Sequence, residues 1–153
     1  MRDARVAFVG DGSSNVCQSW INAAAMMKFS LQIGAPDLYR PHPEIVAAAG
    51  RRCTLTNQPS EAVAGADLVV TDTWAGMGQE AEKAERLKVF HGFQIDSQMM
   101  AGAAPDALFM HCLPAYRGQE VAAEVIDGLQ SVVWDEAENR LHAQKALIEF
   151  LLA

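Results

Sequence analysis

The sequence predicts an α/β fold, a three-layer αβα sandwich in which helices cover both faces of a central parallel sheet. Two observations carry this prediction: short apolar runs alternate with helical segments along the whole chain, and turn residues such as Gly10 and Pro36 close the first two runs. Alternation of this kind is typical of parallel sheets, because each crossover between strands lays a helix against the sheet. A chain of 153 residues can bury a sizeable core, and we expect residues 1–153 to form one domain.

The first half of the chain supplies three strands and the helices between them. Strands are expected at residues 6–9, 31–33 and 53–56, and helices at residues 15–29, at residues 43–49 and from residue 60 onward. The first of these helices places Val16, Trp20 and Ala23 on one face, which is the periodicity of an amphipathic helix. The second begins with proline and stops before a glycine, the usual asymmetry of helix ends.

The second half continues the alternation. Strands are expected at residues 67–71, 107–110 and 131–134, and helices at residues 79–88, 94–101 and 137–152. The last helix ends in a strongly apolar run, residues 147–152, with little polar capping. This helix therefore either folds back on the sheet or packs against something outside this chain.

Charge and cysteine content exclude several classes of function. The chain carries 12 basic and 19 acidic residues, for a net charge of −7, and has no basic cluster, which argues against a nucleic-acid partner. No stretch is long and apolar enough to span a membrane, and the first residues lack the apolar core of a signal peptide. The three cysteines are odd in number and fit neither a disulfide framework nor a zinc spacing. We therefore expect a reduced, cytoplasmic compartment.

A polar run from His111 to Gly118 follows the strand expected at residues 107–110. It places an imidazole, the Cys112 thiol and a proline-stiffened turn where that strand ends. Because open α/β sheets bind ligands at the carboxyl ends of their strands, this run is a candidate site. Taken alone, the run is better explained as a strand end with a buried cysteine and a turn-forming proline.

Asp72 follows a run that should be fully buried, so its carboxylate is expected at the same edge of the sheet. Such a carboxylate can hold a substrate cation, or accept its proton if an amine must become a nucleophile. The run Gly76-Met77-Gly78 then gives a backbone that can approach a ligand closely. A helix cap or a surface aspartate before a loop is an equally good interpretation of Asp72.

The first strand is followed by Gly10-Asp11-Gly12, with Asn15 where a dinucleotide fingerprint would have its third glycine. One interpretation is a tight turn in which Asn15 caps the first helix. The other is that Asn15, at a helix N-terminus, faces a polar group of a ligand.

Arg140 lies early in the last helix, after the acidic residues 135–138. One interpretation is a salt bridge to that acidic cluster. The other is a guanidinium that polarises a carbonyl group or holds a phosphate oxygen.

Several of these runs together resemble the ornithine carbamoyltransferases. The runs that carry the resemblance are Asp72-Thr73-Trp74…Met77-Gly78-Gln79-Glu80, His111-Cys112-Leu113-Pro114-Ala115 and Asp135-Glu136-Ala137-Glu138-Asn139-Arg140. The His-Cys-Leu-Pro run is shared across several carbamoyltransferases, whereas Asp-Thr-Trp with Met-Gly-Gln-Glu points to the ornithine enzymes. The resemblance runs the whole length of the chain.

The resemblance implies a Rossmann-like fold and transfer of a carbamoyl group from carbamoyl phosphate to the δ-amine of L-ornithine, with no metal or organic cofactor. The resemblance implies that ornithine is bound by four residues, namely Asn15, Asp72, Met77 and the neighbouring Gly76. It implies that carbamoyl phosphate is bound by three residues, Cys112, Leu113 and Arg140. Asp72 and Cys112 are the expected catalytic residues, since they would orient and deprotonate the amine. Arg140 would stabilise charge on the carbonyl oxygen.

The chain also departs from the family pattern. Gly76 stands where the family usually has Ser, Tyr116 where it has His, and Ser14 where Asn is common. The Ser-Thr-Arg-Thr and His-Pro-x-Gln runs of the family's first domain, which hold the phosphate, have no counterpart in the sequence.

The sequence therefore matches only the second, ornithine-binding domain. We expect the chain to be inactive alone and to bind carbamoyl phosphate only together with a first domain, toward which the family's last helix crosses. The alternative is a non-catalytic ligand-binding or interaction module that self-associates through uncovered apolar surface.

Overall fold

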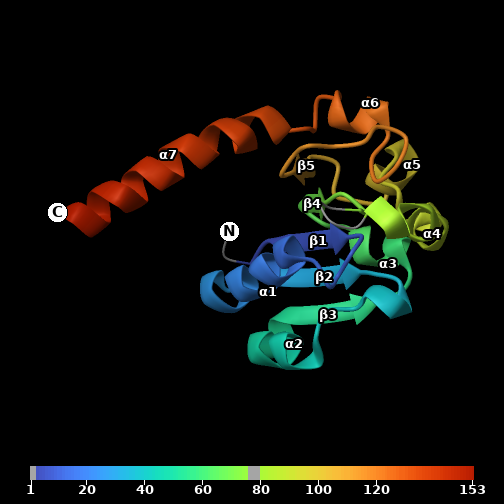
Figure 1. Ribbon diagram of the computed structural model, residues 1–153, viewed down its shortest axis with the longest axis horizontal. Helices are drawn as coiled ribbons and strands as arrows, with labels where there is room; N and C mark the ends of the chain where they lie inside the picture. Colours follow the sequence, from blue (N-terminus) through green and yellow to red (C-terminus); the bar gives the residue numbers. More distant parts are fainter. Residues whose placement is uncertain (1–2, 76–79) are drawn as a thin grey trace.

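A parallel sheet lies at the centre of the molecule (Figure 1). The computed structural model describes residues 3–75 and 80–153, and within them the sheet has five strands in the order β3-β2-β1-β4-β5. The strands are β1 (Arg5–Val9), β2 (Ser30–Gly34), β3 (Cys53–Thr56), β4 (Leu68–Thr71) and β5 (Leu108–His111). Each pairs with its neighbours in parallel. The expected α/β class and parallel sheet are confirmed.

Seven α-helices connect or follow these strands in the described residues. They are α1 (Asn15–Met27), α2 (Pro43–Ala49), α3 (Pro59–Val63), α4 (Lys83–Val89), α5 (Ser97–Met100), α6 (Ala123–Ile126) and α7 (Val133–Leu152). Short 3₁₀ turns stand at η1 (Asp37–Tyr39), η2 (Gly50–Arg52), η3 (Glu80–Glu82) and η4 (His91–Phe93). The helix expected at residues 94–101 is therefore reduced to α5.

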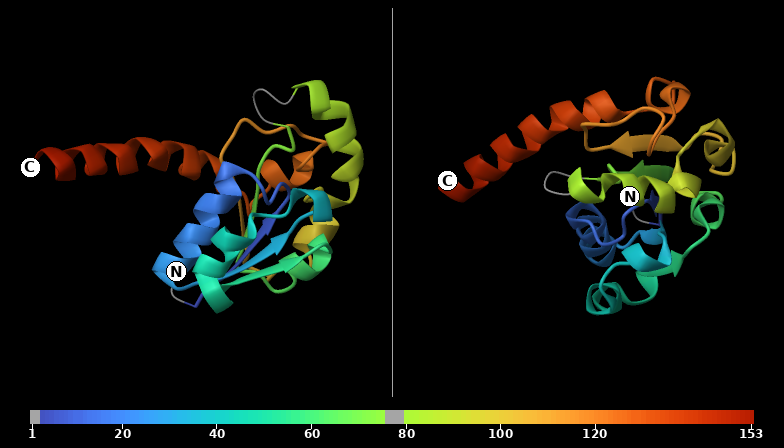
Figure 2. Two further views of the ribbon diagram at one scale, coloured as in Figure 1. Left: turned by 60° about the horizontal axis from the view of Figure 1, so that its bottom comes forward. Right: turned by 45° about the vertical axis from the view of Figure 1, so that its right-hand side comes forward.

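Helices lie on both faces of the sheet and give the molecule three layers (Figure 2). A separate apolar core fills the space between the sheet and the helices on each face. Alternate residues of a strand point to opposite faces, so Val6 and Phe8 of β1 enter one core while Ala7 and Val9 enter the other. The first core lies under α1 and α2, and the second lies under α3, α5 and α6. The αβα sandwich is thus the arrangement that buries both faces.

Residues 131–134 do not form the sixth strand that the sequence predicts. Ser131 makes only an isolated bridge to Phe109, and the helix α7 already begins at Val133. The apolar, β-branched residues suggest a strand, but Asp135 and Glu136 fall in the first helical turn, where negative charge favours a helix N-terminus. Val133 is fully buried in the second core, so burial there needs no strand.

Helix α7 leaves the body of the molecule and projects away from the sheet (Figures 1 and 2). Val133 is its buried residue, whereas the side chains of Leu147, Phe150 and Leu152 are 56%, 80% and 82% exposed. The helix does not fold back on the sheet, so its apolar end is uncovered in this chain. No helix in the described part of the chain is long and apolar enough to cross a bilayer.

The strand order creates a switch point between β1 and β4. The chain leaves β1 toward α1, on one face, and leaves β4 toward α4 and α5, whose apolar residues pack on the other face. Open α/β sheets bind ligands in the crevice outside the carboxyl ends of the strands at such a point. The loops that follow β1, β4 and β5 therefore meet where a ligand is expected.

Candidate functional site

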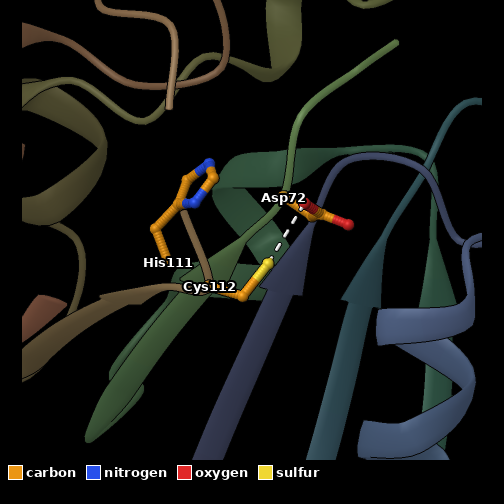
Figure 3. A group of neighbouring side chains, drawn as sticks. All are labelled: Asp72, His111 and Cys112. Carbon is orange, nitrogen blue, oxygen red and sulfur yellow. Dashed lines mark hydrogen bonds between the residues drawn. The ribbon is translucent and has the colours of Figure 1, made fainter. Parts of the chain in front are cut away.

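Asp72 and Cys112 meet at the carboxyl edge of the sheet (Figure 3). Each follows directly on a strand, and the β4–β5 register pairs the preceding residues, Thr71 and His111. The Cys112 thiol donates a hydrogen bond to Oδ1 of Asp72 at an Sγ–Oδ1 distance of 3.4 Å. The backbone N–H of Thr73 donates to the same oxygen at 2.8 Å. The two donors fix one oxygen of Asp72, and in Figure 3 the other points away from Cys112.

The Cys112 thiol is held in its neutral form. Desolvation raises its pKa most, followed by the charge of Asp72 and the hydrogen bond to it, and together these raise the pKa to about 12. Solvent still reaches the exposed side chain. Because the thiolate is the nucleophile and is scarce at neutral pH, this environment favours a thiol that donates a hydrogen bond over one that attacks.

A buried pair, His111 and Glu120, shapes the turn that carries Cys112. Both side chains are fully buried, and His111 Nε2 lies 3.3 Å from Glu120 Oε1. The N–H of Leu113 donates to His111 Nδ1 at 3.0 Å, so Nε2 is the protonated nitrogen that donates to Glu120. Glu120 Oε1 also accepts from the N–H of Tyr116 at 2.6 Å. The pair therefore holds the backbone on both sides of Pro114.

Helix α7 adds a third carboxylate to this edge. Oε2 of Glu136 accepts a hydrogen bond from the backbone N–H of His111 at 3.0 Å. Burial raises the pKa of Glu136, and the charge of Asp72 raises it further, while the bond from His111 lowers it. Two carboxylates near one thiol favour a cationic ligand such as an ammonium group.

The start of α1 lies beyond the loop after β1. Ser14, not Asn15, caps the helix, since its side chain accepts from the N–H of Cys17. The predicted capping by Asn15 is therefore wrong. Asn15 is the first helical residue and is exposed. Gly12 is needed for packing, because a Cβ there would lie 2.8 Å from the carbonyl oxygen of Tyr39.

The aspartate/ornithine carbamoyltransferase Asp/Orn binding domain model matches residues 2–151 of this chain. The chain belongs to that family. It is 58% identical over 147 residues to the ornithine carbamoyltransferase of Methylococcus capsulatus and 60% identical over 147 residues to that of Nitrosococcus oceani. Each match covers 96% of this chain but 49% and 48% of the relative. The chain thus spans about half the length of the curated relatives it matches.

Solved structures of the carbamoyltransferase family give the same result. The Burkholderia thailandensis ornithine carbamoyltransferase superposes with a TM-score of 0.87 at 49% identity, covering 99% of this chain and 48% of that one. The anabolic ornithine carbamoyltransferase of Campylobacter jejuni superposes with a TM-score of 0.91 at 43% identity, and the match covers 97% of this chain and 51% of that one. The expected family and the Rossmann-like fold are confirmed.

Of the other residues that the family resemblance singles out, Arg140 lies on α7. It is exposed, and within residues 3–75 and 80–153 it has no ion-pair partner, so the salt bridge to residues 135–138, one of the two interpretations of this residue, is not observed. Arg140 is four residues after Glu136 and therefore on the same side of the helix, about 6 Å farther along it. Gly76 and Met77 lie outside the described residues.

Asp72, His111 and Cys112 each offer a ligand atom, and these atoms lie within 4.8 Å of one another, as a metal site would require. However, both ring nitrogens of His111 are already paired, one with Leu113 and the other with Glu120. We therefore interpret the cluster as a hydrogen-bonded turn.

Sequence reasoning missed four charged residues that build this edge, namely Asp11, Arg86, Glu120 and Glu136. Asp11, Arg86 and Glu120 are buried. Asp11 stands between two glycines at a strand end, a position that could have signalled a structural role. Nothing in the sequence around Arg86 or Glu120 separates these residues from ordinary surface charges.

Proposed function

We propose that this chain forms the ornithine-binding side of an ornithine carbamoyltransferase active site. The observation that carries the proposal is the contact between Asp72 and Cys112 at the ends of β4 and β5. It places a carboxylate acceptor and a neutral thiol together at the edge where the fold binds ligands. Membership of the carbamoyltransferase family supports the substrate assignment.

In the proposed reaction the δ-ammonium of ornithine binds at Asp72 and loses a proton to that carboxylate. The free amine then attacks the carbonyl carbon of carbamoyl phosphate. A C–N bond forms, the bond from carbon to the phosphate oxygen breaks, and the attacking nitrogen gives its second proton to the departing phosphate, so that citrulline and phosphate are released. Cys112 keeps its proton and orients the amine, while Asn15 and the segment containing Gly76 and Met77 bind the rest of ornithine.

The phosphate must be held by residues beyond those in this chain. We propose that a first domain supplies them, that Cys112 and Leu113 face the carbamoyl group, and that Arg140 stabilises the oxyanion of the tetrahedral intermediate. The exposed position of Arg140 on a projecting helix is consistent with a ligand held between two domains. On this proposal the chain alone is inactive.

The test is complementation. The chain is mixed with the amino-terminal half of the Methylococcus capsulatus relative, and citrulline is measured from ornithine and carbamoyl phosphate. We expect turnover only in the mixture, and its loss in Asp72→Asn. The matched control is Asp106→Asn, which alters an exposed aspartate just before β5, at the opposite edge of the sheet. Turnover by the chain alone, or turnover that Asp72→Asn leaves intact, would contradict the proposal.

A second candidate function rests on α7. Its exposed apolar residues, Leu141, Leu147, Ile148, Phe150, Leu151 and Leu152, form a surface on which an interaction module could self-associate. Light scattering of the chain at rising concentration tests this function. An oligomer that dissociates in the double variant Leu147→Glu, Leu151→Glu supports self-association. A monomer at every concentration refutes self-association.

A further inference from the structure

Arg86 of α4 contacts two of the loops that build the candidate site. We propose that it is a positioning residue for ornithine, which locks the loops after β1 and β4 to each other. This inference rests on the proposed function, since the ligand is the ornithine assigned there. Arg86 does not contact ornithine in this proposal and acts only through the loops.

The side chain of Arg86 contacts both Asp11 and Trp74. Its side chain is 4% exposed, and its Nη2 forms an ion pair with Oδ2 of Asp11, whose side chain is 5% exposed. Its Nε donates a hydrogen bond to the carbonyl oxygen of Trp74. Asp11 belongs to the loop after β1 and Trp74 to the loop after β4, so one guanidinium joins the two neighbouring strand ends.

A third loop closes over the guanidinium. Its Cζ lies 4.4 Å from the centre of the Tyr39 ring and 5.5 Å from that of Phe90. Tyr39 is in η1, which follows β2. The aromatic rings exclude water from the ion pair and hold the plane of the guanidinium, an arrangement that suits arginine better than lysine.

Each bridged loop leads directly to a proposed ornithine-binding residue. Oδ1 of Asp11 accepts from the N–H and the hydroxyl of Ser13, at 2.9 and 2.6 Å, and so shapes the turn that leads to Asn15. Trp74 is two residues after Asp72. The separation between Asn15 and Asp72 therefore depends on Arg86. The fit of a ligand that contacts both residues depends on Arg86 for the same reason.

The decisive variant is Arg86→Lys, which keeps the charge but cannot donate to Asp11 and Trp74 with the same planar geometry. In the complemented enzyme we expect its KM for ornithine to rise at least tenfold while its KM for carbamoyl phosphate is unchanged. Arg52→Lys is the matched control, because Arg52 directly precedes β3 at the opposite edge of the sheet, where its Nη1 donates to the carbonyl oxygen of Lys28 at 2.7 Å, and we expect it to change neither constant. An Arg86→Lys enzyme with wild-type KM for ornithine would overturn the proposal, as would an equal rise in both constants.

Amide hydrogen exchange provides a test that needs no ligand. In Arg86→Lys we expect the amides of Ser13 and Thr73 to exchange faster together, while amides of β1 and β4 keep their protection. Faster exchange in only one loop would contradict the bridging role. If the complemented wild-type enzyme neither binds nor turns over ornithine, the proposed function fails, and the exchange result still decides whether Arg86 couples the loops. Asp11→Asn serves as the second variant, and we expect the same pattern from it.

Discussion

At the Cys112 thiol, burial and the charges of Asp72 and Glu136 all raise the pKa, and only a backbone hydrogen bond opposes them. A side chain in this environment is suited to donating a hydrogen bond to a carboxylate and to staying protonated while an amine reacts beside it. In the proposed mechanism the acid–base role therefore belongs to Asp72. The sequence predicted both residues because each directly follows a strand, and strand ends meet at one edge.

The first prediction concerns the reactivity of Cys112. Asp72→Asn removes a neighbouring charge, so the pKa of Cys112 should fall, although desolvation keeps it above the usual value. Each unit of decrease raises the thiolate fraction about tenfold. At pH 9 we expect Asp72→Asn to be alkylated by iodoacetamide several-fold faster than the wild type, as followed by mass spectrometry. The buried Cys17 and Cys53 are internal controls, and an unchanged rate would show that Asp72 does not act on the thiol.

The second prediction concerns Glu136 and pH. Its pKa in the folded protein lies above the ordinary 4.5, so the folded state holds this proton more tightly than the unfolded state does. The stability that this provides is present below pH 4.5 and is lost as pH rises through the raised pKa. The free energy of unfolding is measured by urea titration at pH 4.5 and at pH 7. Between these two pH values the wild type should lose more stability than Glu136→Gln does. The same difference between the two proteins at both pH values would refute the prediction.

At the scale of elements, the strands could be predicted because short runs between turn residues carry the information locally. The segment 131–134 could not, since its residues satisfy a strand pattern while burial of Val133 and the acidic first turn of α7 select a helix. The buried charges were missed for a related reason. Whether Arg86 is at the surface or inside depends on Asp11, 75 residues away in the chain.

The third prediction concerns the loop after β1. A Cβ at Gly12 would lie 2.7 Å from Cδ of Pro41 and 2.8 Å from a backbone carbonyl oxygen, so Gly12→Ala should force the loops apart. Overpacking of this kind typically costs about 1–3 kcal/mol. Gly92→Ala is the matched control, because a Cβ there meets nothing within 4 Å. Chemical denaturation should show a loss of stability in Gly12→Ala alone, and equal stabilities of the two variants would contradict the packing argument.

For the whole molecule, the proposed function makes the chain one side of a site. Its carboxyl edge gathers Asp72, Cys112 and Glu136, and its last helix extends apolar side chains into solvent. Its relatives are about twice as long. These features support the proposal that the chain closes a substrate site together with a second domain. The resemblance accordingly assigns to this chain the expected ornithine-binding residues and only some of the residues expected to bind carbamoyl phosphate.

The most direct test of the central claim, that Asp72 binds the δ-amine of ornithine, is calorimetric titration of the chain with two ligands. One is L-ornithine, and the other is L-2-aminopentanoic acid, which has the same backbone and lacks that amine. We predict that the wild type binds ornithine more tightly than aminopentanoic acid and that Asp72→Asn loses this preference. Equal affinity of the wild type for the two ligands, or a preference that survives in Asp72→Asn, would contradict the account.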